Sequence, residues 1–188
     1  RAGRVMNYGD GIYGGMFVSC MYSAAVVESD PRRIVEAGLA CIPAKSPYGL
    51  LIADVLAWHK QNPKDWKKAW KLIEQKWNKR EPCPAGALVP FNIDAKLNGA
   101  YIALGLLFGD SDFAKTLEIA TRAGQDSDCN PASAGGILET KKIGDMAQEY
   151  GVPMVLHFAG SPVSMMANVH CAAATENLLT LEFHAADI

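Results

Sequence analysis

The segment between residues 12 and 28 constrains the fold most strongly, because it is apolar around nearly its whole circumference at helical spacing. Its apolar side chains are Met16, Phe17, Cys20, Met21, Ala24, Ala25 and Val27. A helix without a polar face needs apolar neighbours on every side, so it belongs at the centre of an assembly. The sequence therefore predicts a protein in which other helices pack around residues 12–28.

Further helical segments follow at short intervals, and their start signals are clear. Asp30 and Pro31 fit the N-cap and first position of a second helix. The other expected helices follow a Lys-Ser-Pro turn at 45–47, span 65–78, follow Asn92 and begin at Asp112. The third should end near His59, where a partly charged imidazole would favour the helix dipole. Short connections between so many helices predict an all-α bundle.

Composition excludes several classes of function. Hydrophobic residues make up 49% and charged residues 20% of the 188 residues, which is typical of a globular protein. A net charge of −2 does not provide the excess of positive charge that binds nucleic acid. No apolar run is long enough to span a membrane. The tryptophans between residues 58 and 77 are spaced as one buried helical face rather than as stacking platforms.

The cysteines suggest where the protein works. Five of them are scattered, with no Cys-x-x-Cys pair, and this pattern predicts five free thiols in a cytoplasmic compartment. The first residue is Arg1 rather than Met, so we expect a fragment or a processed chain.

The run from Gly124 to Asn130 carries the strongest chemical signal. Asp126 and Asp128 lie two residues apart between two predicted helices, with Cys129 beside them. In a turn both carboxylates can converge on one point, and hard divalent cations prefer such oxygen ligands. Either carboxylate could instead cap the helix that starts after Asn130. The spacing alone leaves both interpretations open.

The same run resembles the second metal motif of the ADP-ribosylglycohydrolase family, which reads Gly-x-Asp-Thr-Asp-Thr or Asp-Thr-Asp-Cys-Asn. The resemblance extends through residues 5–138 and includes the segments 7–17, 38–43 and 105–113. It implies an all-α fold and hydrolysis of a ribosyl glycosidic bond in a small-molecule or ADP-ribosyl substrate. The family's first metal motif, a Thr-Asp-Asp cluster, has no counterpart, so the bundle is expected to be incomplete at its N-terminus.

This resemblance also implies a set of site residues. Asp126 and Asp128 would hold Mg²⁺, with Cys129 as a weaker ligand and two ions in a complete site. Asn7, Asp10 and Gly11 would bind substrate, because the equivalent loop lies at the family's substrate cleft. Without the first motif, we expect weak ion binding, and a second chain could complete the site. The oligomeric state is open.

The pattern changes after residue 136. Residues 136–150 predict a helix, whereas 152–158 form an apolar run typical of a buried strand. A second helix over 162–175 and a second strand over 178–183 complete a strand–helix–strand unit, which belongs to a parallel sheet. We therefore expect two regions, residues 1–138 and 139–188.

The second region resembles the end of the TIM-type barrel of the enolase superfamily, in its mandelate-racemase branch. The match is carried by residues 135–154 and by two strand ends. It implies that His157 is a general base and that Glu182 stabilises an enediolate. The alternative functions are thus an acid-sugar dehydratase or racemase fragment, or a non-catalytic remnant. Both side chains could equally be ordinary residues at strand ends.

Overall fold

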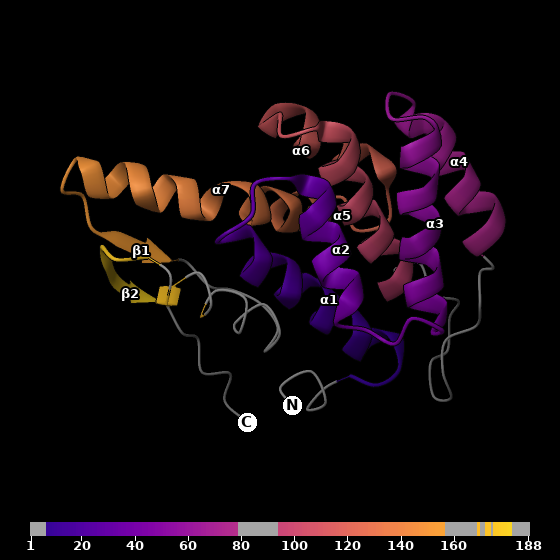
Figure 1. Ribbon diagram of the computed structural model, residues 1–188, viewed down its shortest axis with the longest axis horizontal. Coiled ribbons are helices and arrows are strands. Elements are labelled where there is room, and N and C mark those ends of the chain that lie inside the picture. Colours follow the sequence, from indigo (N-terminus) through magenta and orange to yellow (C-terminus); the bar gives the residue numbers. More distant parts are fainter. Residues whose placement is uncertain (1–6, 79–93, 157–168, 170–171, 174, 182–188) are drawn as a thin grey trace.

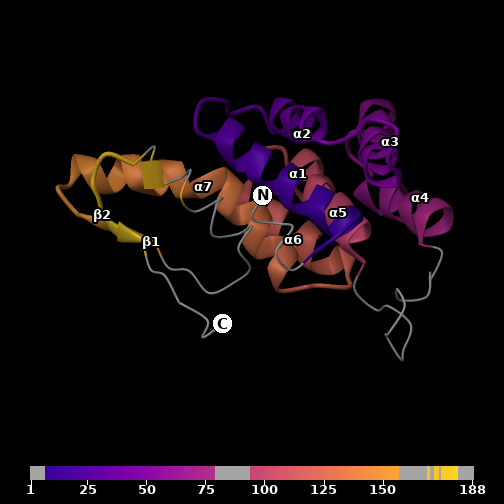
Figure 2. The same cartoon turned by 90° about the horizontal axis from the view of Figure 1, so that it is seen from below.

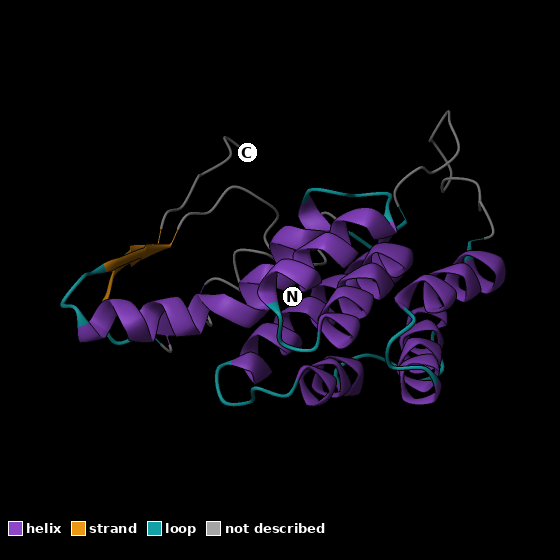
Figure 3. Ribbon diagram, turned by 90° about the horizontal axis from the view of Figure 1, so that it is seen from above, coloured by secondary structure: helices purple, strands orange, loops and turns teal. Residues whose placement is uncertain are grey.

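The computed structural model describes residues 7–78, 94–156, 169, 172–173 and 175–181, with the backbone alone for residues 137–142. The helices of the bundle are α1 (Asp10–Ala25), α2 (Pro31–Ala40), α3 (Pro47–Gln61), α4 (Trp66–Trp77), α5 (Ala95–Gly109), α6 (Phe113–Ala123) and α7 (Cys129–Glu149). The described residues before β1 contain no strand (Figure 3). The predicted mainly α fold is therefore confirmed.

Helix α5 is the centre of this bundle. Every residue from Lys96 to Gly109 in it is buried, and it contacts each of the other helices (Figure 1). Only Phe17 and Met21 are fully buried in α1, so the prediction that residues 12–28 form the central helix was wrong. Both helices are apolar all round, but one side of α1, which includes Gly11, Gly14 and Gly15, borders a cavity instead of packed side chains alone.

Aspartates start three of the helices where the sequence predicted them. Asp30 accepts a hydrogen bond from the Arg32 amide (2.8 Å), and Asp112 accepts one from the Lys115 amide (2.9 Å). Asp65 does the same for α4, from the amide of Lys68 (3.0 Å). Each bond satisfies an amide that has no partner within its own helix, which fixes the start of that helix.

The tryptophans pack against the core as their spacing predicts. Trp58, Trp66, Trp70 and Trp77 are partly buried beside the core side chains. The indole of Trp70 also donates a hydrogen bond to the carbonyl of Ala123 (2.7 Å), the last residue of α6. This contact ties α4 to the end of α6, directly before the Gly124–Asn130 run.

A disulfide joins Cys20 of α1 to Cys41 at the end of α2. The prediction of five free thiols was therefore wrong. The two cysteines are 21 residues apart in the sequence, but the packing of α2 on α1 brings their Cα atoms to 6.5 Å. Cys129 is free, whereas Cys83 and Cys171 lie outside the described residues. The cytoplasmic location was inferred from free thiols, and the disulfide removes that reason for it. The location stays a prediction.

Helix α7 begins earlier than expected and continues past the bundle. It starts at Cys129 rather than after Asn130. Its first half packs on α1, α5 and α6, and its second half projects away from them (Figure 1). The predicted boundary at residue 138 lies within this continuous helix, and the division into two regions stays a prediction. Among the described residues, no helix is long and apolar enough to cross a membrane.

Two short strands follow the projecting half of α7. Strands β1 (Met154–Leu156) and β2 (Leu178–Leu181) pair in parallel, as predicted, with Leu156 opposite Leu181. The side-chain amide of Gln148 on α7 donates to the carboxylate of Glu176 (2.6 Å), which fastens the pair to the helix. Most of the helix predicted over residues 162–175 lies outside the described residues.

Candidate functional site

The turn between α6 and α7 is built on an unusual backbone. Gly124 ends α6 with φ of 101° and ψ of −162°, a conformation open in practice only to glycine. Gln125 follows with φ of 47°, and its side-chain oxygen accepts a hydrogen bond from the amide of Asp94 (2.8 Å). The chain thus reverses sharply after α6 and is anchored to the start of α5.

A buried pair of asparagines holds the turn against α5. The side-chain oxygen of Asn98 accepts hydrogen bonds from the Asn130 side-chain amide (2.7 Å) and from the backbone amide of Asp126 (3.2 Å). The side-chain amide of Asn98 donates to the carbonyl of Asp94 (2.9 Å). Asn98 and Asn130 are 8% and 2% exposed, so these bonds are shielded from water. Together they fix where Asp126 lies.

The predicted metal ligands lie close together. Ligand atoms of Asp126, Asp128 and Cys129 are all within 4.8 Å of one another. The carboxylate of Asp126 accepts a long hydrogen bond from the amide of Cys129 (3.4 Å), whereas Asp128 makes no side-chain cap bond. The capping interpretation thus fits Asp126 weakly and does not fit Asp128. Asp126 thus contacts the first turn of α7 and lies beside Asp128.

Asp128 and Cys129 differ in their protonation. A hydrogen bond with the side chain of Asp126 lowers the pKa of Asp128, so that carboxylate is ionised at neutral pH. Burial, with the nearby Asp126, raises the pKa of the Cys129 thiol to about 11. The thiol is therefore protonated and is a poor ligand for a hard cation. Two carboxylate donors fit Mg²⁺ but supply fewer than the six ligands it takes.

A cavity of about 400 Å³ lies beside these residues. It is lined by residues of α1, α3, α5 and α7, and α1, α5 and α7 contact one another, as their ribbons in Figure 2 indicate. Its walls come from the residues before and within α1, from the start of α5 and from the Asp126 turn. The lining residues are Asn7, Gly11, Gly14, Gly15, Val18, Tyr48, Ala95, Asn98, Gly99, Ile102, Asp126, Cys129, Asn130 and Ser133. Its size and mixed lining suit a small polar ligand.

The structure brings four of the eight predicted site residues to this cavity. Asn7 and Gly11 line it together with Asp126 and Cys129, which are more than a hundred residues away in the sequence. Asp10, the first residue of α1, and Asp128 lie next to lining residues but are not among them. Their roles stay predictions.

His157 and Glu182 lie outside the described residues. In the sequence they directly follow Leu156 and Leu181, the two residues that pair at the ends of β1 and β2.

Most of the lining residues were not predicted as site residues, among them Asn98, Gly99 and Tyr48. Asn98 is a polar residue in a helix that is otherwise almost entirely apolar, and this is the signal that could have identified it. Gly99 beside it is one of three glycines in this helix and gave no such signal. Tyr48 gave none, because in the sequence it resembles any aromatic residue near the start of a helix.

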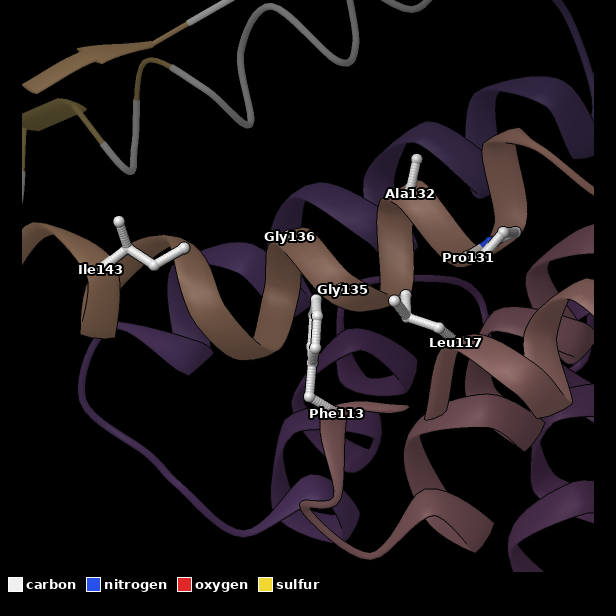
Figure 4. Close-up of a pocket in the computed structure, with 7 residues that line it drawn as sticks. All are labelled: Phe113, Leu117, Pro131, Ala132, Gly135, Gly136 and Ile143. Atoms are coloured by element: carbon white, nitrogen blue, oxygen red, sulfur yellow. The ribbon is translucent and has the colours of Figure 1, made fainter. Parts of the chain in front are cut away.

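A second cavity of about 420 Å³ lies between α6 and the first half of α7 (Figure 4). Its lining is apolar: Phe113, Leu117, Pro131, Ala132, Gly135, Gly136 and Ile143. None of the described side chains that line it is polar, so they offer nothing to orient or activate a substrate. The cavity beside Asp126 is therefore the candidate site.

The C-terminal part of the chain is similar to known dehydratases. The pattern of the enolase C-terminal domain-like family matches residues 119–187. A 50-residue segment, 27% of this chain, is 46% identical to the D-xylonate dehydratase of Haloferax volcanii and covers 12% of it. The arabinonate dehydratase of Saccharolobus solfataricus is 42% identical over 50 residues, which cover 13% of that protein. The chain thus spans about an eighth of these curated relatives.

The larger part of the chain matches another family. No solved structure matches the chain, but the pattern of the ADP-ribosylglycohydrolase family matches residues 1–138 of the 188. That stretch contains the bundle from α1 to α6, the Asp126 turn and every residue that lines the candidate cavity. The match covers most of the sequence and its key residues meet at one cavity: the chain belongs to the ADP-ribosylglycohydrolase family.

Proposed function

We propose that this chain is a Mg²⁺-dependent hydrolase that cleaves a ribosyl glycosidic bond, with its site in the cavity beside Asp126. The observation that carries the proposal is the meeting of two sequence segments. Asn7 and Gly11, at the start of α1, line the same cavity as Asp126 and Cys129, at the start of α7. Family membership indicates the class of bond.

The chain's own residues have distinct tasks in this proposal. Asp126 and Asp128 would hold the ion, and Asn98 would position Asp126 through its backbone amide. Asn7 and Gly11, which line the same cavity, would contact the sugar. A bound Mg²⁺ would orient or activate a water molecule for attack on the anomeric carbon. The described residues near the cavity offer no obvious carboxylic acid placed to protonate a leaving group.

Titration calorimetry with Mg²⁺ or Mn²⁺ tests the ion site. We expect millimolar affinity at best, because two carboxylates leave most ligand positions to water. Asp126→Asn and Asp128→Asn should each abolish binding and the thermal stabilisation that Mg²⁺ provides. Asp145→Asn, which changes an exposed carboxylate on the projecting half of α7, is the control and should bind as the unchanged protein does. Micromolar binding that survives both substitutions would place the ion elsewhere.

Release of ADP-ribose from an ADP-ribosylated substrate tests the reaction. The proposal expects release that depends on Mg²⁺ and is lost in Asp126→Asn. Release that continues in a chelator would contradict it.

A second function is favoured by the match over residues 119–187 and by the parallel pairing of β1 and β2. In that case the chain would act on sugar acids, with His157 as general base and Glu182 as the acid that stabilises an enediolate. Thermal stabilisation by D-xylonate or D-arabinonate, lost in His157→Asn, would support it. A protein that responds neither to Mg²⁺ nor to these acids would be a non-catalytic remnant.

A further inference from the structure

The hydroxyl of Tyr48 is a buried polar group that the fold does not use. Tyr48 is fully buried in the core, and among the described residues its hydroxyl has no hydrogen-bond partner. The same residue lines the cavity beside Asp126. Burying a hydroxyl without a partner costs free energy, and phenylalanine would fill the same space without that cost.

The neighbouring backbone is shaped around this hydroxyl. A Cβ atom on Gly99 of α5 would lie 1.7 Å from the Tyr48 oxygen, so any other residue there would displace the ring. On the α1 side, a Cβ on Gly14 would lie 3.6 Å from the same oxygen. The Phe17 ring packs against the Tyr48 ring, with centroids 5.7 Å apart. The ring is thus held between α1 and α5, and the two glycines nearest its hydroxyl, Gly14 and Gly99, line the cavity together with Tyr48.

A second buried tyrosine, Tyr101, has a hydroxyl that holds two helices together. Tyr101 lies on α5, whereas Tyr48 lies on α3. Tyr101 is 1% exposed, and its hydroxyl donates a hydrogen bond to the carboxylate of Glu74 on α4. That bond joins two helices away from the cavity. Tyr48 makes no comparable bond to a described residue, so its hydroxyl does not serve to hold helices together.

We propose that Tyr48 is a substrate-binding residue, whose hydroxyl donates a hydrogen bond to an oxygen of the sugar that enters the cavity. This inference rests on the proposed function, and it identifies a residue of that site that binds the sugar. The ligand class is a ribosyl compound, whose several hydroxyls could also meet Asn7 and Asn98 on the walls. Burial, with Asp10 and Asp94 nearby, raises the pKa of Tyr48, which keeps its hydroxyl protonated as a donor.

The test compares Tyr48→Phe with Tyr101→Phe by calorimetric titration with ADP-ribose at constant Mg²⁺ and by thermal unfolding without ligand. Tyr48→Phe should weaken ADP-ribose binding about tenfold, the effect of one lost hydrogen bond. Its melting temperature should stay the same or rise, because an unpartnered buried hydroxyl is removed. Tyr101→Phe should show the opposite pattern, with a lower melting temperature and unchanged affinity.

Other outcomes overturn the inference and leave the proposed function to its own tests. Equal affinity of the unchanged protein and Tyr48→Phe would show that the hydroxyl does not contact the sugar. A melting temperature that falls in Tyr48→Phe would show a structural role. Absence of ADP-ribose binding to the unchanged protein would also reject the inference, whereas the Mg²⁺ titration with Asp126→Asn judges the ion site independently.

Discussion

Gly124 determines the geometry of the turn that carries Asp126. Its φ of 101° lies where a side chain is strained, yet a Cβ there would have no atom within 4 Å. Gly124→Ala should therefore lose about 1–3 kcal/mol of unfolding free energy through backbone strain alone. Urea denaturation measures this loss.

Gly14→Ala is the matched control for this substitution. Gly14 lies within α1, and a Cβ there would make only ordinary contacts, the nearest at 3.5 Å. The change should be neutral or stabilise by up to about 1 kcal/mol, since alanine favours helix. Equal losses in both variants would mean that the backbone at Gly124 is not strained by a side chain.

His59 differs from its sequence-based interpretation. Burial, and then the charge of Arg32, lower its pKa below the ordinary 6.5, and its ring meets that of Phe108 at a centroid distance of 4.9 Å. Neither Asp110 nor Asp30, which act in the opposite direction, reverses the shift. The imidazole is therefore neutral in the fold, so the prediction of a partly charged group at the helix dipole was wrong.

This shift makes the protein sensitive to acid. Because the unfolded chain binds the His59 proton more readily, stability is full above pH 6.5 and falls as the pH drops through the folded pKa. In urea denaturation between about pH 7.5 and about pH 5, the unchanged protein should lose more stability than His59→Phe. Identical pH profiles for the two proteins would contradict this explanation.

At the level of elements, the disulfide between α1 and α2 closes a short loop. Linking Cys20 to Cys41 across 21 residues restricts the unfolded chain and should stabilise the fold by about 3 kcal/mol. Reductant, or the double variant Cys20→Ala with Cys41→Ala, should lower the unfolding free energy by that amount. The double variant should not respond to reductant. Thiol titration that finds Cys20 and Cys41 free without reductant would exclude the bond.

Helix starts were predictable where one side chain acts locally. Asp30, Asp65 and Asp112 each cap the helix that directly follows them. The start of α7 was not predictable in this way. Asp128 makes no cap bond, and the position of the turn depends on Asn98 and Gln125, which bond across distant parts of the chain.

At the level of the whole molecule, stability should be distributed unevenly. The amides of α5 lie in the core, whereas β1 and β2 form a two-stranded sheet with Val155 54% and Leu179 69% exposed. Two strands alone are marginally stable. In native-state hydrogen exchange, α5 should exchange only through global unfolding. The amide of Met154, bonded to the carbonyl of Asn177 (2.9 Å), should exchange far sooner. Equal protection of both would show one cooperative unit.

The sequence predicted the helical bundle because helices depend on local spacing, and it predicted the cluster at Asp126 through the resemblance of residues 124–130 to a family motif. It did not predict which apolar helix lies at the centre, since α1 and α5 have similar patterns and differ in what surrounds them. Nor did it predict the pairing of Cys20 with Cys41 or the contact of Tyr48 with Gly99. Those depend on packing between segments that are distant in the chain.

Helix α7 joins the helical bundle to the two strands. All of its residues that line the candidate cavity lie between Cys129 and Ser133, in its first two turns. The remaining turns carry β1 and β2 away from the bundle (Figure 1). The match to the enolase C-terminal domain-like family begins at residue 119, so it shares residues 119–138 with the ADP-ribosylglycohydrolase match. The shared stretch contains the turn and the part of α7 that line the candidate cavity, so a change made there alters both family segments at once.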